Sequence, residues 1–476
     1  MPPGQFLSRL GNNPRSRFLL QSQNASDLVK KVRVINLGCS KNQVDSENIL
    51  GEFGRAGFTL AGEHDVSQVT VINTCGFIEA AKEESIQEIL GAVQHRQRGE
   101  KVVVAGCLSQ RYMDELSREI PEADLFVGTY KSGEILEKLG LSSTLPSDCL
   151  VGAAPRTLMG EEPHHAFLKI AEGCNRVCGF CAIPGMRGKQ RSRDIANIVA
   201  EAQQLESWGV KEISLIAQDL TFFGREKNHE ENLEDLLKAL LRETGISWFR
   251  LMYAYPAFLT DGLLNIMASE KRVCKYLDMP VQHASNRMLK AMRRNYTGES
   301  LREQLRQLRR IVPGIALRTT VLLGYPGETE DDVQELMDLV QETRFRHLGG
   351  FTYSDEEGTH AFDLGGKIPT EVMEDRLRRV MDLQREIAAE DNQARIGSTV
   401  EVMIDSVAEG ESHHFVGRTQ GDAPEVDGRI LIHGALDAEI GSFRRVFVTD
   451  AREYDLEGQL LPVGAHGHAP LPAIPV

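Results

Sequence analysis

The sequence of 476 residues has no apolar run of about eighteen residues, so we expect no membrane-spanning helix. It also has no hydrophobic signal core near its start, and no acidic residue precedes Asp27. We therefore expect residues 1–30 to form a disordered extension, with a transit peptide as the alternative. Basic residues are in deficit, because 54 lysines and arginines face 69 acidic residues and the net charge is −15. That balance argues against a protein that mainly coats nucleic acid, and it favours a basic partner.

Cysteine is also scarce, with eight residues in the chain. Six of the eight fall into two sets that are arranged as metal ligands, and free thiols of this kind are typical of a reducing cytoplasm. We therefore expect a cytoplasmic protein. Cys149 and Cys274 have no neighbours at ligand spacing, and we interpret them as bystanders.

One loop carries three of the cysteines, Cys174, Cys178 and Cys181, in a Cys-x-x-x-Cys-x-x-Cys pattern. The apolar segment 166–171 is expected to be a buried strand, which places the loop at a carboxyl strand end, where α/β folds bind ligands. Three thiolates this close cannot all pair as disulfides, and structural zinc prefers four ligands. The spacing therefore predicts a 4Fe–4S cluster with one open iron. A zinc site with a distant fourth ligand and reduced spectator thiols are the alternatives.

The second set of cysteines follows three predicted strands near the start of the chain. Strands are expected at 32–38, 69–74 and 101–106, with helices at 45–57, 77–96 and 109–120. Such alternation predicts a parallel sheet, whose strands all end at one edge. Cys39, Cys75 and Cys107 each follow a strand directly, so we expect them to converge on a second three-ligand 4Fe–4S cluster. Three independently buried cysteines are the alternative.

The middle of the chain, residues 160–396, repeats strands and helices and is predicted to form a partial (β/α)6 barrel with a lateral mouth. Its strands are expected at 166–171, 212–217, 249–255, 276–281, 316–323 and 348–352. Its helices are expected at 194–208, 233–242, 261–269, 301–311 and 331–343. A further long charged helix over 370–396 is expected to be a solvated connector.

Beyond Gly397 the pattern changes to short alternating strands, which predicts a small antiparallel β-barrel of OB-like type. Residues 397–462 contain thirteen acidic residues and five arginines but no lysine, a net charge of −8. A barrel that grips RNA should be basic. We therefore expect this barrel to meet a basic protein surface, through acids such as Asp422, Glu425 and Asp427. A solvated acidic face is the alternative.

Together these features resemble the methylthiotransferases that use radical S-adenosylmethionine chemistry. The resemblance rests on the strand-end cysteines, on the stretch from Glu172 to Gly188, and on the C-terminal barrel, which is similar to a TRAM domain. It covers about residues 31–462. It implies a methylthiotransferase N-terminal domain (31–142), a linker (143–159), a radical S-adenosylmethionine core (160–396) and a TRAM domain (397–463). The expected disordered extension (1–30) and a tail (464–476) lie outside the resemblance.

The resemblance implies two 4Fe–4S clusters and S-adenosylmethionine as cofactors. The cluster on the Cys174 loop would cleave S-adenosylmethionine to a 5′-deoxyadenosyl radical, and the other cluster would offer the sulfur. An external electron donor and a sulfur source are the implied partners. The residues expected to bind the cofactor are Phe180, Gln218, Gln282, Gly324, Pro326, Gly327 and Glu328.

Within the family, the sequence is most similar to the RimO-type branch, which modifies an aspartate β-carbon of a basic small-subunit ribosomal protein (protein twelve). The stretches 36–47, 278–285 and 416–427 carry this similarity. His283 stands where the tRNA-modifying branch tends to have serine, and contact with nucleic acid is not required. Ser40 and the loop 220–223 depart from the branch's usual pattern. The competing interpretations are a tRNA adenosine methylthiotransferase, a non-catalytic iron–sulfur scaffold and a zinc-stabilised interaction protein.

Overall fold

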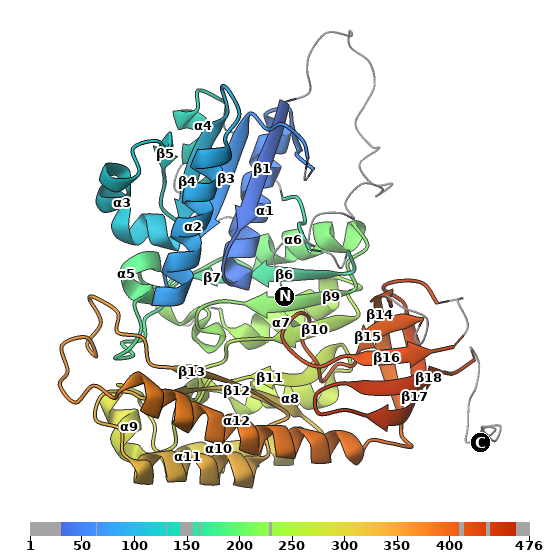
Figure 1. Ribbon diagram of the computed structural model, residues 1–476. Coiled ribbons are helices and arrows are strands. Elements are labelled where there is room, and N and C mark those ends of the chain that lie inside the picture. Colours follow the sequence, from blue (N-terminus) through green and yellow to red (C-terminus); the bar gives the residue numbers. More distant parts are fainter. Residues whose placement is uncertain are drawn as a thin grey trace. The chain divides into compact units, whose positions relative to one another are not determined.

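The computed structural model describes residues 30–62, 64–129, 131–142, 156–160, 163–227, 231–408, 414–434 and 438–462 (Figure 1). The predicted extension up to residue 29, Cys149 with most of the linker, and the tail lie outside these residues. The chain forms two compact units, each made of separate stretches. The first comprises Met1–Met159, Ala171–Glu201 and Ser354–Phe362, and the second comprises Gly160–Ile170, Ala202–Tyr353 and Asp363–Val476.

The first unit contains a five-stranded parallel sheet in the order β2-β1-β3-β4-β5. Its strands are β1 (Lys30–Asn36), β2 (Phe58–Leu60), β3 (Val69–Thr74), β4 (Lys101–Gly106) and β5 (Leu125–Phe126). Its helices are α1 (Ser40–Arg55), α2 (Glu79–His95), α3 (Cys107–Glu119) and α4 (Ser132–Lys138). A short antiparallel ribbon of β7 (Ala171–Glu172) and β8 (Arg191–Ser192) flanks α5 (Ile183–Arg187), and α6 (Ile195–Ser207) begins in this unit. The parallel sheet confirms the predicted α/β class of this region.

Both faces of this sheet are buried. Alternate residues of a strand point to opposite faces, so Val71 and Val103 pack with apolar side chains of α1 and α4, whereas Ile72 and Val104 pack with those of α2 and α3. With the faces covered, the strand ends remain for ligands. In an open sheet whose order reverses next to its first strand, ligands bind at the carboxyl ends beside that reversal. The reversal here lies between β1 and β3.

The second unit contains an open sheet of six parallel strands in the order β13-β12-β11-β10-β9-β6. The strands are β6 (His165–Lys169), β9 (Glu212–Ile216), β10 (Trp248–Leu251), β11 (Val273–Asp278), β12 (Ala316–Leu323) and β13 (His347–Thr352). The helices are α7 (Leu233–Glu243), α8 (Asp261–Ser269), α9 (Asn286–Ala291), α10 (Gly298–Ile311), α11 (Glu330–Thr343) and α12 (Thr370–Gln393). Short 3-10 turns are η4 (Leu220–Phe222), η5 (Arg225–Lys227) and η6 (Pro256–Phe258). This order confirms the predicted partial (β/α)6 barrel.

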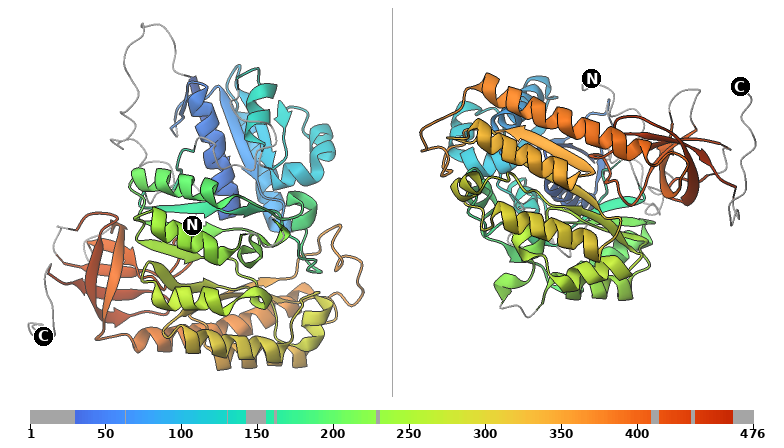
Figure 2. Two further views of the ribbon diagram at one scale, coloured as in Figure 1. Left: turned by 180° about the vertical axis from the view of Figure 1, so that it is seen from behind. Right: turned by 90° about the horizontal axis from the view of Figure 1, so that it is seen from below.

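Helices α7, α8, α10, α11 and α12 pack side by side in this order and form an outer layer (Figure 2). The prediction that residues 370–396 form a solvated connector is only half right. Val380 and Ile387 are buried on one face of α12, which packs against α11 and β13, while charged residues cover its other face. The helix is therefore part of the wall of the unit.

The C-terminal part of the second unit is a closed barrel with neighbouring strands in the order β14-β15-β16-β18-β17. Its strands are β14 (Thr399–Val407), β15 (Phe415–Arg418), β16 (Ile430–His433), β17 (Phe443–Ala451) and β18 (Leu456–Leu460). The small closed barrel confirms the predicted C-terminal β-barrel, but it is not wholly antiparallel, because β16 and β18 pair in parallel. Among the described residues, no helix is both long enough and apolar enough to cross a membrane.

Candidate metal centres and cofactor site

Three cysteines lie at the carboxyl edge of the first unit's sheet, as predicted. Cys39 follows β1, Cys75 follows β3, and Cys107 follows β4 as the first residue of α3. The three strands are direct neighbours, and the residues that pair across them include Asn73 with both Asn36 and Ala105. Cys39 is exposed, Cys75 is half-buried and Cys107 is buried. The edge thus presents thiols that range from buried to solvent-facing.

Two glycines beside these cysteines, Gly38 and Gly106, have no side chain where a Cβ atom would collide with neighbouring atoms. Gly38 has φ +92°, a region that residues with a Cβ atom rarely adopt. A Cβ atom built at Gly38 would lie 2.8 Å from Cys75 Cβ and 3.0 Å from Cys75 Sγ. Gly106, with φ +95°, is equally constrained, because its Cβ would lie 2.5 Å from the Thr74 carbonyl oxygen. The backbone beside two of the cysteines therefore requires glycine.

Asn42 at the start of α1 forms hydrogen bonds with the backbone at the carboxyl ends of β1 and β3. Its side-chain amide donates to the carbonyl oxygens of Leu37 at 2.8 Å and Thr74 at 3.0 Å. The side chain of Asn73 donates in turn to the Asn42 carbonyl oxygen at 2.8 Å. These bonds fix the loop that carries Cys39 against the end of β3.

Burial keeps two of the thiols neutral in the absence of a ligand. It raises the pKa of Cys107 to about 12, against the opposing effect of the Arg187 cation, and it also raises the pKa of Cys75. A negative charge on Cys39 also acts to raise the pKa of both thiols, and Cys75 acts in the same direction on Cys107, so the three sulfurs influence one another. A bound metal stabilises the thiolate form, and this set of neighbouring soft donors fits an iron–sulfur cluster.

The second cysteine set lies on the loop between β7 and α5, also in the first unit. The Cys174 N–H donates to the Gly188 carbonyl at 3.0 Å, and the Cys181 N–H donates to the Cys178 carbonyl at 3.1 Å. The Arg176 N–H donates to Cys174 Sγ at 3.4 Å. Backbone amides therefore both fold this loop and approach its sulfur, which suits a thiolate that binds a cluster.

A stretch from far along the chain supports this loop. The Ala361 N–H donates to the carbonyl of Gly179, between Cys178 and Cys181, at 2.7 Å. In the same stretch, the buried carboxylate of Glu356 pairs with Arg111 at 2.7 Å and Lys82 at 3.1 Å. Arg111 also donates to the Gly76 carbonyl, next to Cys75, at 3.1 Å. Residues Ser354–Phe362 thus contact the surroundings of both cysteine sets within the first unit.

The donors at the two candidate centres are thiols. Within the described part of the chain, no three His, Cys, Asp or Glu side chains are grouped closely enough to hold one metal ion. In a 4Fe–4S cluster each cysteine binds a different iron. Both cysteine sets consist of thiols alone, which is the donor set of such clusters.

The predicted cofactor residues of the second unit lie at the carboxyl ends of its strands. Gln218 follows β9, Gln282 follows β11, and the turn from Gly324 through Gly327 follows β12. Gln282 has φ +67°, and its backbone bonds to β12 through Thr320 and Leu322 at 2.9 Å each. Phe180, in the first unit, is half-buried on the cysteine loop.

Glu328, directly after the turn, has internal partners in the second unit. Its side chain is fully buried. Its carboxylate accepts the Gly324 N–H at 2.9 Å and pairs with Arg376 at 2.9 Å. His283 Nδ1 accepts the Ala284 N–H at 2.9 Å, so the proton of a neutral ring sits on Nε2, 3.5 Å from Glu328. Glu328 therefore holds the turn in shape and presents no exposed carboxylate.

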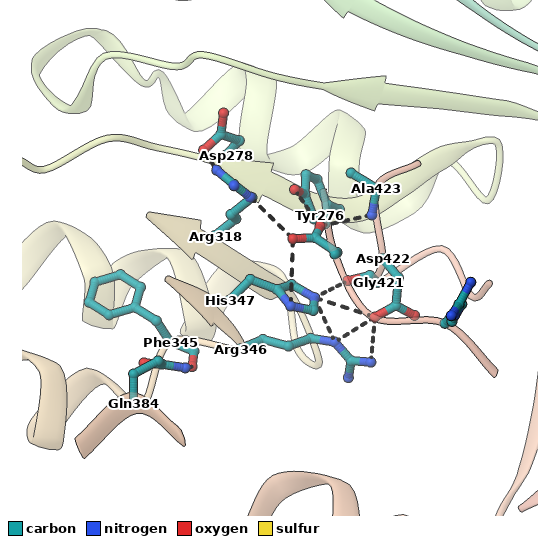
Figure 3. A network of polar contacts seen from close by, with 12 residues as sticks. Tyr276, Asp278, Arg318, Phe345, Arg346, His347, Gln384, Gly421, Asp422 and Ala423 are labelled. Atoms are coloured by element: carbon teal, nitrogen blue, oxygen red, sulfur yellow. Dashed lines mark hydrogen bonds and ion pairs between the residues drawn. The ribbon is translucent and has the colours of Figure 1, made fainter. Parts of the chain in front are cut away.

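The acidic loop of the C-terminal barrel corrects another prediction (Figure 3). Asp422 pairs with Arg346 at 2.8 Å, and Asp427 pairs with Arg318 at 3.1 Å and accepts the Tyr276 hydroxyl at 2.8 Å. Both carboxylates are buried. Burial alone would raise the pKa of Asp422, but Arg346 and His347 hold it well below its usual range.

These two acids are therefore internal partners of arginines on the six-stranded sheet, and neither is available to a basic partner. Glu425, between them, remains exposed. The sequence could not make this distinction, because the arginines that balance the loop lie about eighty or more residues earlier in the chain. A surface acid and a paired acid look the same in a local charge count.

Sequence reasoning also gave no role to Arg187, a buried residue with contacts to both cysteine regions. Its guanidinium pairs with Glu172 at 2.8 Å, and its Nε–H donates to Cys107 Sγ at 3.3 Å. The only signal in the sequence was its place in the motif, six residues after Cys181.

Comparison with known proteins agrees with these features. The chain matches the family model described as uncharacterized protein family UPF0004 over residues 31–128, the radical SAM superfamily over 168–340 and the TRAM domain over 396–461. The solved radical S-adenosylmethionine methyltransferase TsrM from Kitasatospora setae covers 80% of this chain and 82% of its own, with a TM-score of 0.51 and 14% identity. At that identity the likeness shows the fold alone.

Curated relatives match along nearly their full length. The chain is 44% identical over 439 residues to the ribosomal protein uS12 methylthiotransferase RimO of Myxococcus xanthus, which covers 91% of this chain and 92% of that protein. It is 45% identical over 437 residues to the enzyme of the same name from Cytophaga hutchinsonii, which covers 90% and 98%. The chain therefore belongs to the RimO family of radical S-adenosylmethionine methylthiotransferases.

Proposed function

We propose that this protein transfers a methylthio group to the β-carbon of an aspartate in ribosomal protein uS12. Its identity of about 44% to uS12 methylthiotransferases over nearly their whole length supports this substrate. The structural observation that carries the chemistry is the presence of two cysteine sets, three residues each, in one compact unit. A carrier of electrons needs neither a second three-ligand set nor the glutamines and the glycine turn at the strand ends of the second unit.

Members of the radical S-adenosylmethionine superfamily use an iron–sulfur cluster and S-adenosylmethionine, and we infer two 4Fe–4S clusters here. Cys39, Cys75 and Cys107 would hold one, and Cys174, Cys178 and Cys181 would hold the other. When bound, these groups supply a 5′-deoxyadenosyl radical for hydrogen abstraction and the sulfur that is methylated and transferred. An external electron donor and a sulfur source complete the proposal.

The chain's own residues provide clearance, orientation and shielding. Gly38 and Gly106 leave space beside the first cysteine set, and Asn42 holds its loop in place. Residues Ser354–Phe362 brace the second loop through the Ala361 N–H. These contacts limit how far the cysteines move, and a fixed geometry is what a reaction between bound groups requires.

We propose that Gln218, Gln282 and the turn of Gly324, Pro326 and Gly327 in the second unit bind S-adenosylmethionine. Contact of the cofactor with Phe180, on the cysteine loop of the first unit, is what the family resemblance implies. The turn has exposed backbone at Gly327, whose φ of +81° suits glycine. Glu328 contributes by shaping this turn through the Gly324 N–H.

Part of the barrel's acidic charge is not available to a protein substrate. Internal ion pairs with arginines engage three acids of the barrel, Asp405, Asp422 and Asp427. The acids that remain exposed among the described barrel residues include Glu401, Glu425, Glu439, Asp450 and Glu453. We propose that this exposed group meets basic uS12.

The test offers anaerobically reconstituted protein S-adenosylmethionine, sulfide and a reductant, with either ribosomal subunits that carry unmodified uS12 or unmodified tRNA. Mass spectrometry of both substrates follows. We expect a methylthio gain on an aspartate of uS12 and none on tRNA. A gain on adenosine would overturn the substrate while leaving the cofactor chemistry in place.

A further inference from the structure

Arg187 occupies an unusual position for a charged side chain. It is the last residue of α5, whose end is set by Gly188 with φ +71°, and its own exposure is only 2%. A guanidinium cannot lose its charge in a protein, so burial must be balanced by partners. The role of Arg187 therefore depends on which groups its N–H donors contact.

The guanidinium spreads its donors over three elements of the first unit. Nη1 donates to Glu172 at 2.8 Å, two residues before Cys174. Nη2 donates to Asn42 Oδ1 at 2.5 Å and to Asp45 at 3.0 Å, both on α1. Nε donates to Cys107 Sγ at 3.3 Å. One side chain therefore connects a predicted ligand of the first cysteine set to the entrance of the second cysteine loop.

A purely structural ion pair would not need the sulfur contact. Glu172 and Asp45 already supply two negative charges to balance one guanidinium. They approach the two terminal nitrogens, so the Nε–H is left to point at Cys107. The donor to the sulfur is thus a charged N–H group, while the two carboxylates accept from Nη1 and Nη2.

We propose that Arg187 is a positioning residue that raises the reduction potential of the cluster on Cys39, Cys75 and Cys107. A hydrogen bond to a ligand sulfur and a buried positive charge both favour the more negative, reduced state of a cluster. Through its bond to Glu172, the same side chain also holds the start of the Cys174 loop in a fixed position relative to Cys107. This inference rests on the proposed function only in that these cysteines hold a cluster.

The test compares the full-length protein with its Arg187→Gln and Arg187→Lys variants after anaerobic reconstitution. The reduction midpoint of the first cluster is followed by electron paramagnetic resonance during redox titration. Each titration is repeated in chains with Cys174, Cys178 and Cys181 replaced by alanine, so that only the first cluster contributes. Iron per chain is measured for every sample.

Arg193→Gln is the matched control. Arg193 is also buried, lies six residues away, and pairs with Asn197 and Glu201. Its replacement should cost similar stability, and it should leave the midpoint unchanged. A shift caused by general loosening of the unit would appear in this control as well.

We expect a clear shift to a more negative midpoint in Arg187→Gln, and a smaller shift in the same direction in Arg187→Lys, which keeps the charge but not the fork. An unchanged midpoint in Arg187→Gln would overturn the inference. If that variant does not fold or load iron, a wild-type midpoint in Arg187→Lys would overturn it. Failure to modify uS12 with the shift present would reject the proposed substrate and leave the role of Arg187 standing.

Discussion

At the scale of single residues, burial decides which acids are available to a partner. Asp422 and Glu425 are three positions apart on one loop, yet one is paired with Arg346 inside the second unit and the other is exposed. Removing one member of a buried pair leaves the other charge without compensation. The two acids should therefore respond very differently to the same substitution.

We predict that Asp422→Asn lowers the stability of the second unit by about 3 kcal/mol. Glu425→Gln should change it by less than about 0.5 kcal/mol, because the side chain is exposed. Urea unfolding followed by circular dichroism measures both. Equal midpoints for the two variants would mean that the loop does not depend on the Asp422 pair.

His165 gives a second prediction, which concerns how the stability of the protein depends on pH. Burial is the main cause that lowers the pKa of His165 to about 3; Arg418, Arg250 and His164 act in the same direction, and Glu212 opposes them. Below about pH 6.5 the unfolded chain takes up this proton and the folded chain does not, so stability falls as the pH drops toward 3. From about pH 7 to about pH 5 the loss is about 2 kcal/mol.

His165→Gln removes this titration and keeps a polar group near Ser214, the hydrogen-bond partner of His165 at 3.1 Å. The stability advantage of the wild type over the variant should therefore shrink by about 2 kcal/mol over that pH range. Urea midpoints of the two proteins at both pH values measure the difference. Parallel pH curves would contradict the assignment.

At the scale of elements, the positions of the cysteine-bearing strand ends could be predicted from the sequence, because two simple rules apply. Apolar runs followed by cysteine predicted β1, β3 and β4, and parallel strands must end at one edge. The same reasoning missed β2, β5 and β7, since two or three residues give no periodicity. It also missed Arg187, because its partners on α1 and β7 come together only in the folded unit.

Glycine at the strand ends can be tested at this scale. Gly38 and Gly57 both have positive φ, so alanine at either position costs about 1 kcal/mol of strain. Only at Gly38 would the new Cβ also collide with Cys75, because nothing lies within 4 Å of the Cβ position at Gly57. We predict that Gly38→Ala reduces iron from about eight to about four per chain, while Gly57→Ala retains about eight.

Iron and sulfide analysis of the reconstituted variants measures this effect, with circular dichroism as the check on folding. Full iron in a folded Gly38→Ala protein would show that the first cysteine set does not need the space that glycine provides.

At the scale of the whole molecule, the linear order of three domains, which the resemblance implies, does not describe the compact units. The Cys174 loop and residues Ser354–Phe362 are grouped with the first unit, although the chain on both sides of each belongs to the second. Composition and periodicity predict which elements form, but they do not tell which compact unit a given stretch joins. The grouping places all six predicted ligands in one unit.

The division of labour between the two cysteine sets is the central claim, and one measurement tests it most directly. Cys75→Ala and Cys178→Ala are each assayed with uS12 for 5′-deoxyadenosine and for methylthio product. We predict that Cys178→Ala forms neither, whereas Cys75→Ala still forms 5′-deoxyadenosine but no methylthiolated uS12. Full methylthio product from Cys75→Ala would contradict the account.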